Sequence, residues 1–335
     1  MQERTLTYSK NIKMNESSGE FVRKIKHTIT SPSRIKQFII RLVMYVLLFD
    51  LTYVYIFPFL YMIVTALKSN ADLNDLSVNW IPRSLKYQNF QIAYQLLGYN
   101  RYLKNSVIIT FFATLGHMLG CSFIGYGFAR YNFPLKRVLF LLVIISFIVP
   151  VQTIIVPLYI TYKNFNWLNT FLPLIVPTFF GFGLKGSLFI FLFRQMYLGL
   201  PTDLEQAAKI DGCNFMMTYW RIVVPIARSS FLVTLVLSLV WHWNDFYEPA
   251  IYISKSSMTV LPSRINYLSS IVNAPPDQLF DMLQNAASEL PEGEESLNNA
   301  VMMAGTFLII MPVLVIFSIV QKQFMQGIET TGLKE

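Results

Sequence analysis

The stretch Thr202–Pro225 reads TDLEQAAKIDGCNFMMTYWRIVVP and is polar and helix-forming in a chain that is otherwise strongly apolar. Thr202 precedes Glu205 by three residues, which is the spacing of a capping box at the start of a helix. A proline just before it bars the preceding helix from continuing. The sequence therefore predicts a short helix from about Asp203, a turn or helix end at Gly212, and then a second, apolar and aromatic helix.

The small residues Ala208 and Gly212 are four apart and are expected on one face of this short helix, where another backbone can approach closely. A helix lying on the membrane surface and simply joining two spans would explain the aromatic residues. It would not explain the tight capped turn. A helix–turn–helix too small to be a domain is suited to insertion into a groove on a partner protein.

Composition points to lipid as the solvent. Of the 335 residues, 54% are hydrophobic and only 14% are charged, whereas soluble domains carry about a quarter charged residues. The net charge of +8 resides in short segments between apolar runs, which is how membrane topology signals are distributed, so nucleic acid is not expected as a partner. Cys121 and Cys213 do not suggest a disulfide framework, and no zinc or haem spacing occurs, so no metal site is expected.

Six apolar stretches reach the length of about 20 residues that a helix needs to cross the hydrocarbon core. They do not alternate as the strands of a membrane β-barrel would. The fold class predicted is an all-α integral membrane protein with six transmembrane helices: Phe38–Leu67, Ser106–Ala129, Val138–Tyr162, Phe171–Phe193, Ile226–Ile253 and Val301–Val320.

Lys and Arg predict the orientation. With the N-terminus inside, the inner segments carry 16 of them and the outer segments 8, which favours cytoplasmic termini at a cell membrane. No cleavable signal peptide is expected. Part of the outer segment is acidic, and residues 276–290 have the apolar spacing of a short surface helix. The expected organisation is a basic cytoplasmic tail (1–36), a six-span domain (37–325) with an inner loop (201–225) and an outer loop (254–300), and a cytoplasmic C-terminal tail (326–335).

Prolines and glycines interrupt the third and fourth spans, including Pro150, Pro157, Gly181 and Gly183. Membrane helices tolerate such residues when neighbours satisfy the freed backbone groups. They predict bends and close packing rather than loops. Two interpretations stay open, either kinked helices of a packed bundle or a bend near mid-membrane that opens a cavity.

Charged residues inside spans are costly and usually functional. Asp50 is expected near the cytoplasmic interface, where snorkelling or capping fits better than transport. Lys185 lies about 13 Å from Arg194 along a helix, and either subunit packing or a translocation path would accommodate it. Gln152 is a further candidate for lining a path.

The segment WHWND is the most polar point of the fifth span. Tryptophan rings can stack on a sugar, and Asn or Asp side chains can bind its hydroxyl groups. An interfacial aromatic belt or a subunit contact would explain the same residues. His242 alone is expected to be a hydrogen-bonded bundle histidine. The remaining candidates for the substrate path are Trp241, Trp243, Asn244 and Asp245.

The motif LEQAAKIDG followed by RIVVP resembles the EAA loop of permease subunits of ABC importers. The chain is most similar to maltose-type carbohydrate permeases, in the MalG-like subunit. NSVIITFFATLGHMLGCSFIGYGFARYNFP, IVPVQTIIVPLYI and WHWNDFYEPAIYIS resemble further family segments in the same order. The resemblance runs from about Phe57 to the C-terminus, and it implies the type I importer fold with a cytoplasmic coupling helix.

The resemblance implies a non-catalytic transport subunit. It implies a cytoplasmic ATPase dimer that carries ATP and Mg, with no cofactor in this chain. It also implies a second, homologous permease subunit, an extracellular solute-binding protein and surrounding lipid. Gln206 replaces the glutamate of the family motif, so an ion pair with the ATPase would become a neutral hydrogen bond. The stretch 272–299 resembles an insertion, either a contact for the binding protein or a decorated loop. The coupling residues implied are Glu205, Gln206, Ala207, Ala208, Asp211 and Gly212.

The cargo implied is a sugar or oligosaccharide, and related permeases carry glycerol phosphate or polyols. The chain has no G-x-x-x-x-G-K-[ST] motif, so ATP hydrolysis is expected on another subunit. A membrane-embedded enzyme would need a catalytic constellation that the spans do not show. An ion-coupled secondary transporter would show internal repeats with matched broken helices.

Overall fold

The computed structural model describes residues 32–183, 185–273, 275 and 297–332, and every regular element in these ranges is a helix. The all-helical prediction is confirmed for this part of the chain. The chain divides into two compact units, Met1–Met62 and Ile63–Glu335, and each is described by itself.

The first unit contains most of α2 (Pro32–Ala66). The part Lys36–Ala66 is long and apolar enough to cross a membrane. This helix agrees with the predicted first span. Its almost uniformly apolar sequence, with no polar stripe, is typical of a helix that faces lipid.

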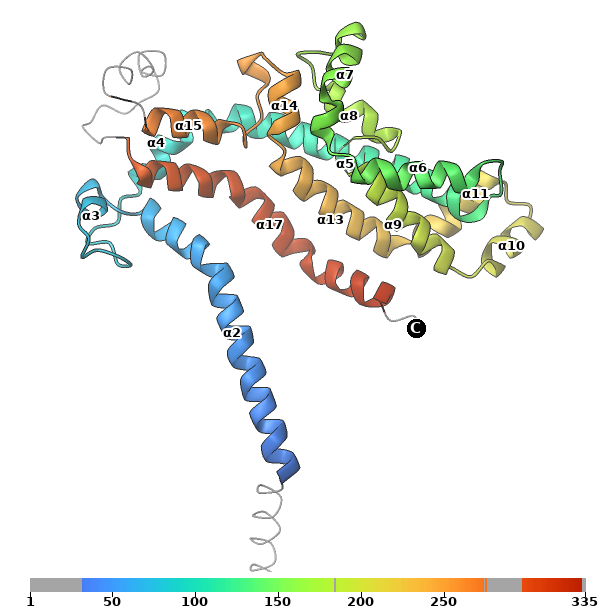
Figure 1. The fold of residues 1–335 in the computed structure, drawn as a ribbon, viewed down its shortest axis with the longest axis horizontal. Coiled ribbons are helices and arrows are strands. Elements are labelled where there is room, and N and C mark those ends of the chain that lie inside the picture. Colours follow the sequence, from blue (N-terminus) through green and yellow to red (C-terminus); the bar gives the residue numbers. More distant parts are fainter. Residues whose placement is uncertain (1–31, 184, 274, 276–296, 333–335) are drawn as a thin grey trace, which may run out of the picture. The chain divides into compact units, whose positions relative to one another are not determined.

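The second unit is built around α5 (Tyr99–Arg130), as Figure 1 shows. Three helices pack against α5, namely α8 (Leu172–Phe179), α9 (Gly186–Gly199) and α13 (Arg228–Asn244). The C-terminal helix α17 (Asn299–Gly332) packs along α13. The second and sixth predicted spans are therefore confirmed as continuous helices, α5 and α17, and both pass the length and hydropathy test for a span.

Glycines on different faces of α5 allow its neighbours to approach. A methyl group added at Gly120 would collide with the backbone carbonyl of Phe179, and one added at Gly116 with the side chain of Thr178. A methyl group at Gly125 would meet the Cβ of Phe193 on α9. Close approach through small residues is the usual way in which membrane helices associate, because lipid supplies no hydrophobic drive.

The predicted third span is a broken helix. α6 (Lys136–Ile148) and α7 (Val151–Asn164) meet at an angle of 104°. Pro150 explains the break, because the residue before a proline is kept out of the helical region and proline itself has no N–H to donate. Val149 accordingly has the extended value ψ 120°.

The predicted fourth span is also interrupted, between α8 and α9. Gly181 and Gly183 have φ angles of 70° and 104°, which are accessible to glycine but strained for other residues. The prediction of bends rather than loops is wrong here, because the chain leaves the helix between Phe180 and Lys185. Two glycines with positive φ angles, two residues apart, cannot be accommodated within a right-handed helix.

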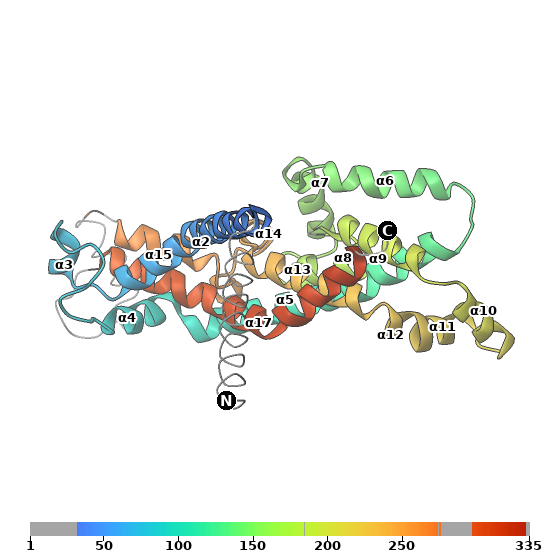
Figure 2. The ribbon, with the colours of Figure 1, turned by 90° about the horizontal axis from the view of Figure 1, so that it is seen from below.

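The predicted inner loop forms two short helices, α10 (Asp203–Ile210) and α11 (Phe215–Thr218). A π-helical turn (Tyr219–Val223) and the short α12 (Val224–Ile226) lead into α13 across a bend of 76°. Figure 2 shows α10 to α12 at one end of the second unit.

The other end of the second unit holds α3 (Asn70–Asn74), α4 (Gln88–Leu97) and α15 (Arg264–Val272), as Figures 1 and 2 show. These elements belong to the predicted outer segments. The predicted short helix at 276–290, and most of the predicted insertion at 272–299, lie outside the described residues.

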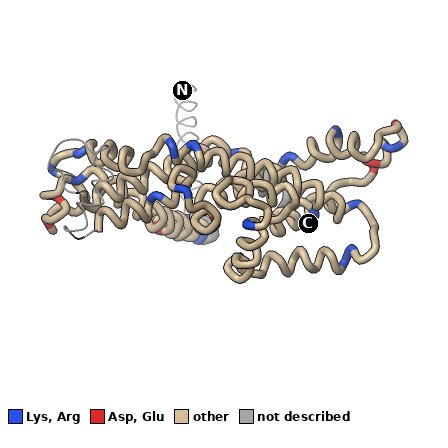
Figure 3. Tube along the Cα trace, turned by 90° about the horizontal axis from the view of Figure 1, so that it is seen from above, with Lys and Arg blue, Asp and Glu red and all other residues tan. Residues whose placement is uncertain are grey.

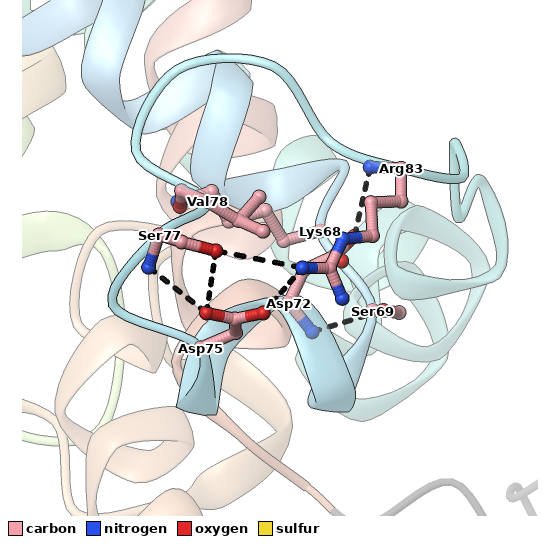
Figure 4. A network of polar contacts seen from close by, with 7 residues as sticks. All are labelled: Lys68, Ser69, Asp72, Asp75, Ser77, Val78 and Arg83. Atoms are coloured by element: carbon pink, nitrogen blue, oxygen red, sulfur yellow. Dashed lines mark hydrogen bonds and ion pairs between the residues drawn. The ribbon is translucent and has the colours of Figure 1, made fainter.

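A polar network organises the loop between α3 and α4 (Figure 4). The Lys68 ammonium donates to the carbonyls of Val78 (2.8 Å) and Asn79 (3.0 Å). The Arg83 guanidinium pairs with the Asp75 carboxylate. These bonds close the loop on itself by satisfying its backbone and its charges locally.

Candidate functional site

The first candidate site is the loop formed by α10 to α12. α10 begins as predicted at Asp203, but its start is not a capping box. The Thr202 side chain makes no cap hydrogen bond. The backbone carbonyl of Thr202 instead accepts from the N–H groups of Glu205 and Gln206, both at 3.0 Å. The capping-box prediction is wrong because the Glu205 carboxylate is engaged elsewhere.

Glu205 forms a buried ion pair with the last turn of α5. Its Oε1 lies 2.6 Å from Arg130 Nε, and its Oε2 accepts from the Tyr126 hydroxyl at 2.8 Å. Arg130 also donates through Nη2 to the carbonyl of Leu200 at 2.8 Å. Glu205 is only 8% exposed. These four residues, Tyr126, Arg130, Leu200 and Glu205, are called the clamp below, and they fasten α10 to α5.

An aromatic cluster fastens the following turn to the same helix. The Ser122 hydroxyl lies 2.6 Å from the hydroxyls of both Tyr197 and Tyr219. The Tyr126 ring packs against Phe215 and Tyr219, with ring centroids 5.7 and 5.2 Å apart. Because α5, α9 and the turn after α11 all contribute, the loop is held to the bundle by side chains and not by its two chain connections alone.

The remaining surface of α10 is open. Ile210 is 86% exposed, and four of the predicted coupling residues are exposed, while Glu205 and Ala208 are buried. Ala208 is only 4% exposed and packs against its own protein, so it does not belong to the exposed face of α10. Figure 3 shows both signs of charge around α10. The exposed predicted residues are Gln206, Ala207, Asp211 and Gly212.

Gly212 turns the chain, as predicted. Its φ angle is 82°, and the N–H of Cys213 donates to the carbonyl of Ala208 at 2.9 Å. This is the backbone pattern of a helix that ends with a left-handed residue. A side chain at Gly212 would meet nothing within 4 Å, so the position needs glycine for its conformation and not for space.

The second candidate site is a cavity of about 680 Å³ in the second unit. Both helix breaks line it, through Val149 and Pro150 on one side and Gly181 and Gly183 on the other, together with the end of α13 and the short helix α14 (Tyr247–Tyr252). The sequence left two readings of these prolines and glycines open. The reading in which they open a cavity is the one that the structure supports.

Three of the six predicted path residues line this cavity: Gln152, Lys185 and Asp245. The Lys185 ammonium lies over the rings of Phe147 and Trp241, at 5.3 and 6.0 Å from their centroids. Trp241 thus contacts the lysine without being among the lining residues.

The other two predicted path residues lie away from the cavity lining. Trp243 is 2% exposed, and its indole N–H donates to the carbonyl of Ile309 at 3.1 Å. Asn244 donates to the carbonyl of Val240 at 2.8 Å within its own helix. Helical periodicity explains the difference, because successive residues of WHWND point in different directions around α13.

Glu248 and His242 were not among the path residues predicted from the sequence. Both line the cavity. His242 Nε2 lies 3.2 Å from His117 Nδ1, so the prediction of a hydrogen-bonded bundle histidine is confirmed. Glu248 follows Asp245 by three residues, and that spacing is the signal that could have identified it. No group of three or more potential metal ligands occurs in the described ranges.

Three comparisons place the chain among known proteins. The family model for the binding-protein-dependent transport system inner membrane component matches residues 121–330. A Bacillus subtilis permease protein of an arabinooligosaccharide transport system, AraQ, is 28% identical over 289 residues, covering 85% of this chain and 92% of that protein.

A permease described as belonging to a probable transport system for starch degradation products, AmyC of Thermoanaerobacterium thermosulfurigenes, is 30% identical over 222 residues and covers 66% of this chain and 78% of that protein. Among solved structures, one chain of a bacterial ABC transporter that imports the acidic polysaccharide alginate matches with a TM-score of 0.68. It is 17% identical and covers 88% of this chain and 98% of that one.

Proposed function

The chain belongs to the family of binding-protein-dependent transport system inner membrane components, and from this premise we propose that it is a permease subunit of an ABC importer that moves a sugar or oligosaccharide into the cell. It is a transport subunit and not a catalyst. Relatives named for arabinooligosaccharide and lactose transport support a carbohydrate cargo.

The observation that carries the proposal is the clamp beneath α10. A helix that receives force from a partner must be attached firmly to the elements that move. The buried Glu205–Arg130 pair, at 2.6 Å, attaches α10 to the end of the 32-residue helix α5. A rigid connection of this kind lets closure of a partner move a whole span as one body.

The partners follow from this role. An ATPase dimer that carries ATP and Mg would receive the exposed face of α10, with Gln206, Ala207, Asp211 and Gly212 at the contact. Glu205 and Ala208 would support that contact from beneath. A second homologous permease would complete the pathway, and an extracellular binding protein would deliver the solute.

A six-span topology with cytoplasmic termini is part of the proposal. α2, α5 and α17 would cross the membrane unbroken, α6–α7 and α12–α13 as bent pairs, and α8–α9 as the fourth crossing. The predicted inner loop lies at the opposite end of the second unit from α3, α4 and α15, which belong to two of the predicted outer segments (Figure 2), and this supports the arrangement. Together with the bias of Lys and Arg, it supports a cytoplasmic location for α10.

The cavity at the helix breaks is the proposed part of the solute path. Broken membrane helices free backbone groups that line a polar passage. The relatives do not fix the chemistry of the cargo, because their names include sn-glycerol-3-phosphate as well as neutral sugars, and the alginate importer carries an acidic polysaccharide.

The test is sugar uptake into proteoliposomes that contain this chain with its co-purifying permease, ATPase and binding protein. We expect uptake that needs ATP inside and persists when ion gradients are collapsed. Uptake driven by an ion gradient without ATP would overturn the proposal in favour of a secondary transporter. Turnover of a lipid or peptide by this chain alone would favour a membrane-embedded enzyme.

A matched pair of variants tests whether the exposed face of α10 is the contact for the ATPase. Gln206→Trp places a large side chain on the exposed face of α10, and we expect it to abolish uptake while the subunit still assembles in the membrane. Ser270→Trp, at an exposed position of α15 at the opposite end of the unit, is the control for the ATPase contact. ATPase binding that survives Gln206→Trp unchanged would mean that the contact lies elsewhere.

A further inference from the structure

We propose that Asp245 and Glu248 form a carboxyl subsite in the cavity that binds the hydroxyl groups of uncharged sugars and disfavours anionic ones. This inference rests on the proposed function, since it names the class of solute that the path accepts. It concerns the solute's charge, which neither the family nor the fold decides.

The backbone presents both carboxyls to the same space. Asp245 directly follows α13, and its Oδ1 accepts from the N–H groups of Tyr247 (3.0 Å) and Glu248 (3.3 Å). These bonds start α14 and leave Oδ2 of Asp245 without a hydrogen-bond partner among the described residues. Glu248 lies one turn further on, and both residues line the cavity.

Glu248 is available for a ligand. It is half-buried, and the described part of the chain gives its carboxyl no hydrogen bond or ion pair. Leaving a polar group covered and without a hydrogen-bond partner is unfavourable in a folded protein. A solute hydroxyl in the cavity would satisfy it. A carboxyl pairs with a hydroxyl in either protonation state, as an acceptor when ionised and as a donor when protonated.

The other titratable groups of the lining do not offset the two carboxyls. They are Tyr162, Lys185 and His242. The Lys185 ammonium lies over two aromatic rings, and no ion pair joins it to either carboxyl in the described ranges. His242 is engaged with His117. The carboxyls therefore outnumber the lysine that could bind an acidic sugar.

The consequence for a solute follows from charge. A uronic acid or phosphate group near an ionised carboxyl meets like charge in a medium that screens poorly. An uncharged sugar meets no such repulsion, and its hydroxyl groups can form hydrogen bonds with the carboxyls. Apolar neighbours in the lining, including Leu158 and Leu174, suit the apolar faces of sugar rings.

The charge of the cavity can be measured directly with thiol reagents. Ser146 lines the cavity and is exposed, so Ser146→Cys places a reporter there in the full-length chain. Its rates of modification by a cationic and an anionic methanethiosulfonate are read by mass spectrometry of the peptide that carries residue 146. Each rate is divided by that of a small free thiol.

We expect the corrected ratio of cationic to anionic rates to be about tenfold at residue 146, since one unit of negative charge at roughly 10 Å, at an effective dielectric constant of about 20 and screened by salt over a Debye length of about 10 Å, favours the cation over the anion by about that factor. Adding Asp245→Asn and Glu248→Gln, which keep the side-chain shapes, should bring the ratio to about one. Ser270→Cys, at an exposed position of α15 that does not line the cavity, is the control and should remain near one throughout.

Three results would overturn the inference. They are a ratio of one or less at residue 146, a ratio that the two amide variants leave unchanged, and failure of either reagent to reach the thiol. None of these depends on ATP-driven uptake. A complex that imports no sugar would refute the proposed function while this measurement still reports on the cavity.

Uptake then links the charge to the cargo. With a binding protein that binds both solutes, neutral oligosaccharide should be imported at least about tenfold faster than a uronate of equal length, and Asp245→Asn with Glu248→Gln should narrow that difference. Equal import of the two solutes by the unmodified complex would contradict the inference while leaving the proposed function intact.

Discussion

The α10 end of the second unit and the cavity at the helix breaks differ in whether their carboxyl oxygens have hydrogen-bond partners. In the clamp, each oxygen of the Glu205 carboxylate has a partner within 2.8 Å. In the cavity, Glu248 has no partner among the described residues, and Asp245 uses one oxygen of two. The difference teaches that one region is built to keep its shape and the other to receive a ligand.

The backbone shows the same contrast. α5 runs without interruption beneath the clamp, whereas the cavity lies where two helices are broken by Pro150 and by left-handed glycines. Local strain and unsatisfied polar groups persist in folded proteins where function requires them. An alternating transporter needs both features, namely a coupling helix that is rigidly attached and a central cavity whose polar groups are free to bind a solute.

The largest effect should come from breaking the clamp. Arg130→Met leaves the Glu205 carboxylate buried without its cation, and removal of one partner of a buried pair costs about 3–5 kcal/mol. We expect faster tryptic cleavage after Lys209 on α10, a lower melting temperature of the purified protein, and loss of ATP-driven uptake.

The double variant Arg130→Met with Glu205→Gln sharpens this test. It removes the orphaned charge and keeps an acceptor for Tyr126, so part of the lost stability should return. If the single variant melts like the parent and resists trypsin equally, the clamp does not hold α10.

A smaller effect is expected from the packing that supports both regions. Gly120→Ala drives a methyl group into the carbonyl of Phe179, and overpacking of this kind costs about 1–3 kcal/mol. The control is Gly127→Ala on the same helix, where an added Cβ meets nothing within 4 Å. Thermal unfolding in detergent should separate the two variants, and equal melting temperatures would show that α5 and α8 are free to move apart.

Substitution of Gly212, in the turn after α10, should affect the coupling of ATPase activity to uptake more than the stability of the bundle. Gly212→Val forces a β-branched residue to a φ of 82°, which costs about 1–2 kcal/mol, while Gly212→Asn tolerates that conformation. We expect the valine variant to lose coupling of ATPase activity to uptake, with little change in the melting temperature of the bundle. Coupling that is equally good in both variants would show that this turn does not need its present geometry.

The smallest effect concerns pH at the α3 end. Hydrogen bonds from the Ser77 hydroxyl and N–H, and more weakly the charge of Arg83, lower the pKa of Asp75 below its ordinary value of 3.8. The stability contributed by this carboxylate is therefore present above pH 3.8 and is lost as the pH falls through the lowered pKa. Because the network is exposed, the loss should be small.

Hydrogen exchange of the peptide that spans Ser69 to Arg83 measures this effect. Protection should decrease from pH 6 to pH 3 beyond the intrinsic dependence of exchange. Asp75→Asn should show low protection at both pH values. A parent loop equally protected at pH 3 would mean that the Asp75 carboxylate does not order it.

The sequence by itself determined the helical class and the position of the short loop helices. Apolar runs of about 20 residues can satisfy their backbone in lipid only as helices, and Gly212 marks the end of α10 whatever surrounds it. The same local chemistry predicted a bend at Pro150 and made Lys185 and Asp245 candidates for a polar site.

Only the tertiary structure decided which polar side chains face one another. Glu205 has the spacing for a cap on Thr202, yet it pairs with Arg130, 75 residues earlier in the chain. Trp243 and Asn244 share a motif with Asp245 and lie off the cavity that Asp245 lines. The physical reason is that helix formation is set by near neighbours in sequence, whereas a buried charge is directed by whichever distant partner the packing brings within reach.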